Sequence, residues 1–289
     1  MKKYCALVAA MAAATVSPLV MADSASIDAQ RIGLFGGVAN MNSNEEGSDY
    51  PNTFEGNAVA NIPVGQSYSV QLGADVAIYG EQDRGDDYGP QSRVTFTTHF
   101  SRRNAETGLV GGFVGLGRGV GYGWPEYTDL GKLAGLEAQR YMGNVTLYGQ
   151  AYYSDFVLYD SGSTRQQVRG FLGSAAARYF PAEDTMLELG IGLGSSRHYN
   201  ESDRGDFSSA SFKAKQRVSK ANPVYASLTL RTAKIDNTTR DSIGYESSVL
   251  VGVEVLFGAT SLKDNDRRGA TLDTPILATQ AAAWNEELY

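Results

Sequence analysis

Several residue types are scarce in this chain, and their scarcity excludes whole classes of protein. The 289 residues include one cysteine, Cys5, and two histidines, His99 and His198. A single cysteine cannot build a disulfide framework or a cysteine-ligated zinc site. Basic residues number 25 against 32 acidic residues, which gives a formal net charge of −7. A nucleic-acid-binding scaffold, which carries a basic face or stripe, is therefore not expected.

Long apolar runs are also missing after the N-terminal region. No later stretch approaches the roughly 18 consecutive apolar residues of a transmembrane helix. Composition alone would thus suggest a soluble globular protein. Glycine and tyrosine are abundant, however, with 33 and 17 residues, and the order of the residues leads to a different interpretation.

The first 22 residues have the pattern of a secretory signal peptide. Lys2 and Lys3 form a positively charged start, an apolar stretch follows over residues 5–20, and the small residue Ala22 precedes the expected cleavage point. We therefore predict an exported protein from which residues 1–22 are removed. Cleavage takes away the cysteine and two of the 25 basic residues, which leaves 23 against 32 acidic residues, a formal net charge of −9.

The rest of the chain alternates between apolar residues and small or polar ones, which is the period of a β-strand with two different faces. In residues 67–79, for example, the even positions are apolar and the odd positions are mostly small or polar. This pattern predicts twelve strands, near residues 30–42, 53–63, 66–79, 91–102, 107–118, 131–142, 144–155, 167–180, 184–195, 207–218, 223–235 and 243–257.

The connections between these segments alternate in length. Those after the even-numbered segments are short, as at residues 63–66 and at Gly143, whereas those after the odd-numbered segments are mostly longer and more polar, as at residues 80–90. Outer-membrane barrels show this alternation, because their short turns lie on the periplasmic side and their long loops outside. We therefore predict an all-β fold over residues 23–258, a transmembrane antiparallel up-and-down β-barrel of about 12 strands.

The two faces of each strand then meet different surroundings. In a transmembrane barrel the apolar face meets lipid and the polar face lines the lumen, the inverse of a soluble sandwich. The polar face here is rich in glycine, alanine and serine, as a crowded interior requires. Aromatic residues near the strand ends predict two interfacial belts, with Tyr68, Phe100, Tyr179 and Phe257 near the periplasmic side and Phe54, Tyr153 and Tyr245 near the outer side.

The last predicted strand alternates apolar residues over residues 249–257 and ends in the aromatic Phe257. It resembles the terminal strand signature of Gram-negative outer-membrane barrels of the porin-like type. The resemblance covers this strand and the general layout, not a family-specific motif. It implies a protein of the cell outer membrane, whose partners are membrane lipid, lipopolysaccharide, the barrel-assembly machinery and small solutes, with no nucleic acid.

In the family that this strand resembles, the signature usually ends the protein, but 32 residues follow Phe257 here. We interpret residues 259–289 as a loose periplasmic tail, with a charged linker at residues 263–268 and a short helix at residues 279–288. The alternative is a plug that enters the lumen from the periplasmic side.

The face assignment predicts which charged residues line the lumen. Lys213, Lys215, Arg217 and Arg231 fall on neighbouring strands and would form a basic stripe on one wall. A lumen enclosed by about twelve strands is narrow, so that each charge acts strongly on a passing solute. The full set of predicted lumen residues is Arg93, His99, Arg178, Lys213, Lys215, Arg217 and Arg231, with Glu55, Asp75, Glu137, Glu188, Glu246 and Glu254.

Two interpretations of these charges stay open. The basic stripe could attract anionic solutes, as in the twelve-stranded porins for acidic oligosaccharides, which the layout loosely resembles. Alternatively, the opposite charges pair across the lumen and stabilise a nearly closed barrel, because unpaired interior charges are costly.

The sequence thus predicts a porin-like pore that lets small solutes pass, rather than an enzyme. The main alternative is a non-conducting barrel with a structural purpose, or one whose acidic outer loops bind a partner. A lipid hydrolase ranks third, because no serine stands in a nucleophile motif such as G-x-S-x-G. The two histidines are not clustered with carboxylates at short spacing, so neither a metal site nor a cofactor is predicted.

Overall fold

The fold is taken from a computed structural model of the chain. It describes residues 26–43, 47–49, 52–80, 91–120, 130–160, 165–197, 204–237 and 242–275. The predicted signal peptide, His198 and the predicted helix at residues 279–288 lie outside these residues.

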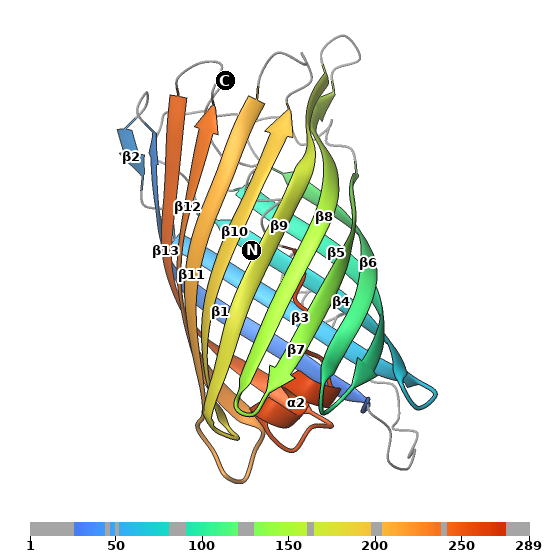
Figure 1. The fold of residues 1–289 in the computed structure, drawn as a ribbon. Coiled ribbons are helices and arrows are strands. Elements are labelled where there is room, and N and C mark those ends of the chain that lie inside the picture. The colour runs from blue at the N-terminus through green and yellow to red at the C-terminus, as the bar shows by residue number, and fades with distance from the viewer. Residues whose placement is uncertain are drawn as a thin grey trace.

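The described residues form a single antiparallel sheet that closes on itself (Figure 1). Each long strand pairs with the next one along the chain, and the last strand pairs with the first, from Gln30 opposite Phe257 to Ser43 opposite Gly244. The predicted up-and-down barrel of twelve strands is confirmed. Its long strands are β1 (Ala29–Ser43), β3 (Asn52–Val64), β4 (Tyr68–Tyr79), β5 (Gln91–Asn104), β6 (Gly108–Val120), β7 (Gly131–Met142), β8 (Val145–Asp160), β9 (Arg165–Ala182), β10 (Thr185–Arg197), β11 (Arg204–Arg217), β12 (Val224–Asn237) and β13 (Ser242–Phe257).

Some strands continue into segments that the sequence predicts as loops. β8 and β9 stay paired as far as Asp160 opposite Arg165, and β11 begins at Arg204. A further short strand, β2 (Gly47–Asp49), pairs with the end of β1. Hairpin pairing needs only backbone groups, so it continues after the alternation of apolar side chains has ended. The apolar pattern therefore marks only part of each hairpin.

The predicted division of the strands into two faces is confirmed by burial. Leu189 and Leu193 on β10 and Val251 on β13 are 65%, 63% and 61% exposed on the outside of the barrel. Polar side chains of the other face, such as Ser69 and Thr97, are buried. An outer surface this apolar and continuous matches lipid rather than water.

Aromatic side chains stand at both ends of the outer surface. Tyr68 and Phe100 stack with their ring centroids 5.7 Å apart at the short-turn end, and Tyr153 packs edge-on against Phe171 at 5.1 Å toward the other end. The residues predicted for the two belts all face outward, namely Phe54, Tyr68, Phe100, Tyr153, Tyr179, Tyr245 and Phe257.

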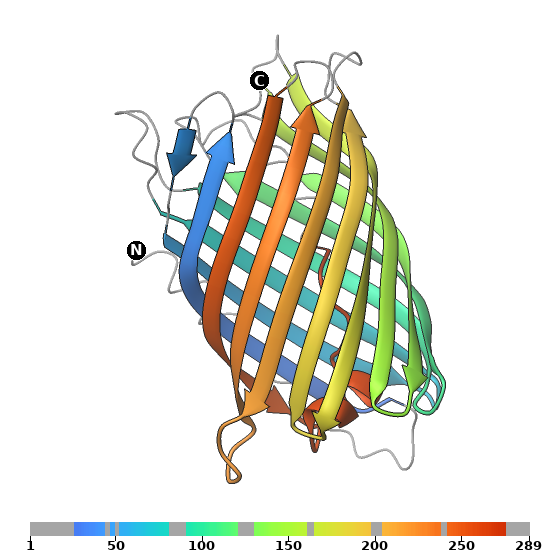
Figure 2. The same ribbon diagram turned by 60° about the vertical axis from the view of Figure 1, so that its left-hand side comes forward.

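The short connections gather at one end of the barrel, the lower end in Figures 1 and 2. Gly143, in the tight turn between β7 and β8, has a φ of 56°. Glycine takes this left-handed conformation without the steric cost that other residues pay. In a barrel of this layout, the short-turn end is the periplasmic one.

The segment after β13 differs from its prediction as a charged linker and loose tail. Residues 262–268 form helix α2 (Leu262–Arg268), and the chain then rises inside the barrel as far as residue 275 (Figure 2). The helix begins because the Ser261 side chain accepts a hydrogen bond from the backbone N–H of Asp264. Within the described residues, no helix has both the length and the apolar character needed to cross a membrane.

Asp264 strengthens the same helix from its first turn. Its carboxylate accepts hydrogen bonds from Arg268, one turn later, at 2.7 Å and from the Thr260 backbone at 2.9 Å. Burial opposes ionisation of this carboxyl, but the hydrogen bonds outweigh it and hold the pKa of Asp264 below its ordinary value. A negative charge in the first turn also favours the helix dipole.

The outward face of β10 generates a test of the barrel's orientation toward lipid. Ile191 is 60% exposed on that face. Ile191→Arg should lower the free energy of unfolding from lipid vesicles by about 2–4 kcal/mol, because the arginine would enter hydrocarbon. Urea titration followed by tryptophan fluorescence or by heat-modifiable gel mobility measures the change.

Ser209→Arg provides the matched control. Ser209 lies on the adjacent strand, opposite Gly192, and lines the lumen. An arginine at position 209 should lower the free energy of unfolding clearly less than one at position 191, because its side chain reaches a polar cavity. Equal losses in the two variants would show that the faces are assigned wrongly.

Candidate functional site

Helix α2 closes the barrel at the end where the short turns lie. Lys263 donates to Glu183 Oε1 at 2.9 Å and to Asn144 Oδ1 at 3.0 Å, and Arg267 donates to the carbonyl of Gly143. These contacts attach the helix to two turns of the barrel. Its one buried leucine, Leu262, completes an apolar cluster with Phe180, Met186, Tyr225 and Leu256.

The chain that follows α2 is held in the lumen by polar side chains of several strands. Gln71 on β4 binds both backbone groups of Leu272, donating to its carbonyl at 2.7 Å and accepting from its N–H at 3.0 Å. Arg103 on β5 donates to the Gly269 carbonyl at 3.0 Å, and Gln150 on β8 donates to the Asp273 carbonyl at 2.9 Å. We call residues 259–275 the plug segment.

The wall of β4 leaves room for the plug segment at Gly73. A Cβ atom there would lie 2.6 Å from Thr97 Oγ1 and 3.1 Å from Thr274 Oγ1. Thr97 and Thr274 are themselves 3.2 Å apart through their hydroxyl groups. The absence of a side chain at residue 73 thus allows the plug segment to lie directly against the barrel wall.

Arg178 on β9 makes several hydrogen bonds to the plug segment. Its Nη1 donates to Asp266 Oδ1 at 2.9 Å and to Thr271 Oγ1 at 2.9 Å, and its Nη2 binds Asp273. Its Nε donates to Glu188 on β10 at 2.6 Å. The guanidinium also lies 4.9 Å from the centre of the Tyr148 ring. Charge-assisted hydrogen bonds of this kind are about twice as strong as neutral ones.

Arg31 on β1 completes the binding of Asp273. Its Nη2 donates to Asp273 Oδ1 at 3.1 Å, so that the two carboxylate oxygens are held by two different arginines. Asp266 is fully engaged as well, because Thr146 donates to its second oxygen at 2.6 Å. Asp266 and Asp273 of the plug segment therefore serve as counter-ions for arginines of the barrel.

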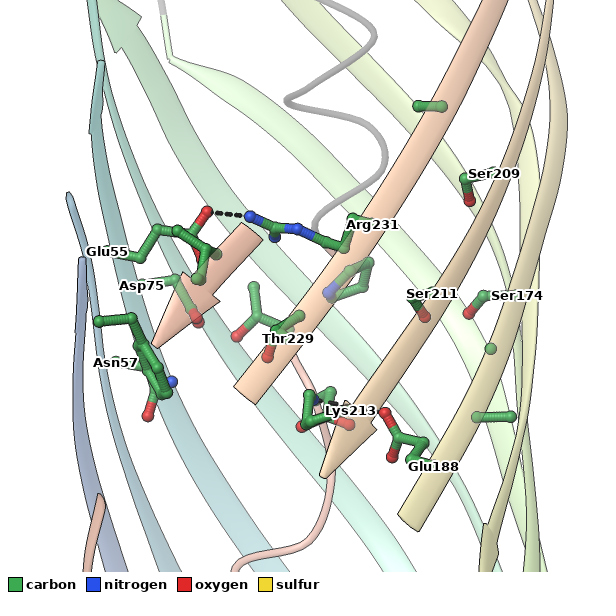
Figure 3. A pocket seen from close by; sticks show the side chains of 18 of the residues that line it. Glu55, Asn57, Asp75, Ser174, Glu188, Ser209, Ser211, Lys213, Thr229 and Arg231 are labelled. Carbon is green, nitrogen blue, oxygen red and sulfur yellow. Dashed lines mark hydrogen bonds and ion pairs between the residues drawn. The ribbon is translucent and has the colours of Figure 1, made fainter. Parts of the chain in front are cut away.

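Several other lumenal charges form ion pairs between strands of the barrel. Lys213 lies 3.3 Å from Glu188 on the adjacent strand, and Lys215 lies 2.7 Å from Glu254, one strand beyond its neighbour. Arg231 on β12 binds Glu55 on β3 (Figure 3). The predicted basic stripe is thus accompanied by carboxylates in this closed arrangement.

A cavity of about 200 Å³ lies above the plug segment. Figure 3 shows Glu55, Asn57 and Asp75 on one wall, with Ser174, Ser209 and Ser211 on another. Asp273 forms part of the floor, since it lines both this cavity and a smaller one below it. The charged residues that line the larger cavity are Arg31, Arg93, Lys213, Lys215 and Arg231, with Glu55, Asp75, Glu188, Glu246, Glu254 and Asp273.

His99 and Glu137 form a separate buried pair. His99 Nδ1 lies 2.8 Å from Glu137 Oε1, and Tyr148 donates to the other oxygen of Glu137 at 2.9 Å. The imidazole ring packs beside Phe113 at 5.2 Å. Gln150 on β8 donates at 3.3 Å to the Glu137 oxygen that Tyr148 binds. We interpret the pair as part of the lumen wall.

The structure brings most of the predicted lumen residues to the cavity or to the plug segment. Arg93, Lys213, Lys215, Arg231, Asp75, Glu188, Glu246 and Glu254 line the cavity, and Arg178 binds the plug segment. Arg217 lies instead at the short-turn end, where it pairs with Asp184 at 3.1 Å. Among the described residues, no group of three or more His, Cys, Asp or Glu side chains is arranged to hold a metal ion.

Four important residues were missed by sequence reasoning. Arg31 lies on a glycine-rich strand whose two faces are hard to distinguish, and Arg103 falls where a short turn is predicted. Asp266 and Asp273 belong to the segment interpreted as a loose tail. One local signal was available, because Ser261 followed by Asp264 is a helix-start pattern.

Comparisons with known proteins agree with the barrel geometry. Neither a family model nor a curated protein matches the chain. Among solved structures, an outer membrane channel from Pseudomonas putida F1 has a TM-score of 0.58 at 14% sequence identity, over 84% of this chain and 100% of that one.

This chain has the fold of an outer-membrane β-barrel.

Two other barrels are less similar in shape. The translocator domain of the autotransporter NalP from Neisseria meningitidis has a TM-score of 0.49 at 10% identity, over 88% of this chain and 94% of that one. The CymD monoaromatic hydrocarbon channel has a TM-score of 0.44 at 8% identity, over 80% and 89%. Sequence identities this low support a similar fold only. The solute and the mechanism therefore have to be inferred from the residues of this barrel.

Arg178→Met tests whether the barrel holds the plug segment through this guanidinium. Removing one partner of a buried ion pair costs about 3–5 kcal/mol, and about 3 kcal/mol corresponds to roughly a 100-fold shift in an equilibrium. We expect trypsin to cleave after Lys263, Arg267 or Arg268 far faster in this variant, in nanodiscs that expose both ends of the barrel.

Arg217→Met is the matched control for that experiment. It removes an arginine at the short-turn end, where Arg217 binds Asp184 and Ser219 rather than the plug segment. Its cleavage rate should stay close to that of the unmodified protein. If Arg178→Met left the rate unchanged while the barrel stayed heat-modifiable, the plug segment would not depend on Arg178.

Proposed function

We propose that the barrel is a channel for small solutes whose lumen is closed at the periplasmic end by its own plug segment, and that the lumen prefers anions once that segment leaves. The observation that carries the proposal is the pairing of two arginines of the barrel with two aspartates of the plug segment. A channel of this kind has a closed state in which its charges are internally compensated and an open state in which they are not.

The charges around the smaller cavity support this interpretation. Four bases of the barrel line it, Arg31, Arg178, Lys213 and Lys215, together with two of its carboxylates, Glu188 and Glu254. The plug segment supplies the other two carboxylates, Asp266 and Asp273. The group is therefore balanced only while the plug segment is in place.

Departure of the plug segment changes that balance. Four bases then face only two carboxylates, Glu188 and Glu254. A narrow lumen gives such uncompensated charge a strong influence on passing ions. The preference for anionic solutes thus belongs to the open state, whereas the closed state has paired charges. The two interpretations of the lumenal charges, attraction of anions and pairing within a closed barrel, thus describe the open and the closed state of one barrel.

A non-conducting structural barrel is the competing function, and the extensive contacts of the plug segment favour it. Gln71, Gln150 and Arg178 hold that segment from different strands, as a permanent filling would require. The two functions differ in one measurable property. If the segment is a permanent structural part, the barrel has no conducting state. If it is a removable plug, the barrel conducts once the segment has left.

Truncation after Gly258 provides the decisive measurement. In planar bilayers the truncated barrel should conduct steadily, and its reversal potential in a KCl gradient should have the sign of an anion preference. A truncation after Pro275, which keeps the plug segment, is the matched control and should stay as closed as the full chain. Heat-modifiable mobility and β-rich circular dichroism establish that each variant has folded.

A folded barrel without residues 259–289 that conducts no ions would contradict the channel. A cation preference in a conducting barrel would contradict only the preference for anions.

A further inference from the structure

The carboxylates of Asp266 and Asp273 occupy one binding site on the barrel. Arg178 presents Nη1 to Asp266 and Nη2 to Asp273, so the two carboxylates bind neighbouring nitrogens of a single guanidinium. Arg31 adds a donor to Asp273 at 3.1 Å. Groups bound this way lie within the span of two carboxylates joined by a short carbon chain.

We infer that this site is a receptor for small dicarboxylates, which compete with Asp266 and Asp273 for Arg178 and Arg31 and thereby release the plug segment. The inference rests on the proposed function and names the ligand class and the regulation of the same site. One carboxylate of the ligand takes the place of Asp273, and the other takes the place of Asp266.

The barrel supplies the affinity for such a ligand without any rearrangement of its own strands. Arg178 is held by Glu188 through Nε at 2.6 Å and stacks on Tyr148, so its Nη1 and Nη2 stay oriented when the plug segment leaves. Bidentate pairing of arginine with carboxylates is both strong and directional. A preoriented guanidinium of this kind favours two carboxylates over one.

A ligand in the larger cavity reaches the site from above. Asp273 has a side chain that is 30% exposed and lines that cavity, whereas Asp266 is buried at 4%. The dicarboxylate therefore meets the Asp273 position first, and displacement of Asp266 follows. Because the ligand and the plug segment exclude each other, ligand binding raises the fraction of barrels with the plug segment released.

The experiment measures trypsin cleavage of the full-length protein in nanodiscs with succinate as the probe. At a succinate concentration about ten times its dissociation constant, the released fraction, and with it the cleavage rate, should rise about tenfold. Acetate at equal ionic strength should leave the rate nearly unchanged, since it offers one carboxylate. Equal effects of succinate and acetate would overturn the inference in favour of simple salt screening.

Two aspartate variants of the plug segment sharpen the result. Asp273→Asn removes a carboxylate bound by both arginines and should raise cleavage without succinate by roughly ten- to a hundredfold, because bonds to charged groups are the stronger ones. Asp264→Asn is the matched control, since Asp264 binds Arg268 and Thr260 and does not touch Arg178. It should respond to succinate as the unmodified protein does.

Arg31→Met tests the barrel side of the site. Because Arg31 also binds Asp273, its loss weakens the plug segment and the ligand alike. Cleavage without succinate should rise, and the acceleration by the same succinate concentration should fall from about tenfold to about twofold, as a roughly tenfold weaker affinity implies. An unchanged succinate response in Arg31→Met would also overturn the inference.

Failure of the inference and failure of the channel are distinguishable. Cleavage reports release of the plug segment whether or not ions pass, whereas the truncated barrel reports conduction without any ligand. If the truncated barrel conducts but succinate does not accelerate cleavage, the channel stands and the dicarboxylate site is wrong. If succinate accelerates cleavage but the truncated barrel conducts no ions, the dicarboxylate site is supported and the proposed channel function is wrong.

Discussion

A β-sheet in hydrocarbon cannot leave an edge, because no water is present to bond the free N–H and C=O groups. The pairing of β13 with β1 meets this constraint, and the rest of the structure depends on it. Closure forces alternate side chains into a confined interior while the others meet lipid. The apolar outer surface, the aromatic residues at its ends and the polar lumen are all consequences of that one closed ladder.

A closed ladder creates a second problem, which is how charged groups inside it are stabilised. Buried charges are costly unless they are paired and hydrogen-bonded. Glu55 and Arg231, or Lys215 and Glu254, solve this within the barrel wall. Arg178 and Arg31 rely in addition on the chain that follows β13, since Asp266 and Asp273 come from there. Compensation of charge and closure of the lumen are therefore achieved by the same contacts.

The strands were predictable because their signal is local and repeated. The alternation over residues 67–79 or 249–257 follows from the two-residue period of a strand, and burial agrees with it on both faces. Most of the lumen residues followed from the same parity. The plug segment was not predictable in this way, because short-range periodicity contains no information about its partners. Arg31 and Asp273 are 242 positions apart, and Gln71 and Leu272 are 201 apart.

The sequence by itself determined the barrel, its approximate strand number, the side of each strand that meets lipid and most of the charged side chains that face the lumen. Only the tertiary structure decided which charges meet, that residues 262–268 form a helix, and that the segment after β13 enters the barrel rather than leaving it. The physical reason is the range of the interactions. Strand parity is set by neighbouring residues, whereas the partner of a buried arginine is set by the closed barrel that brings distant segments together.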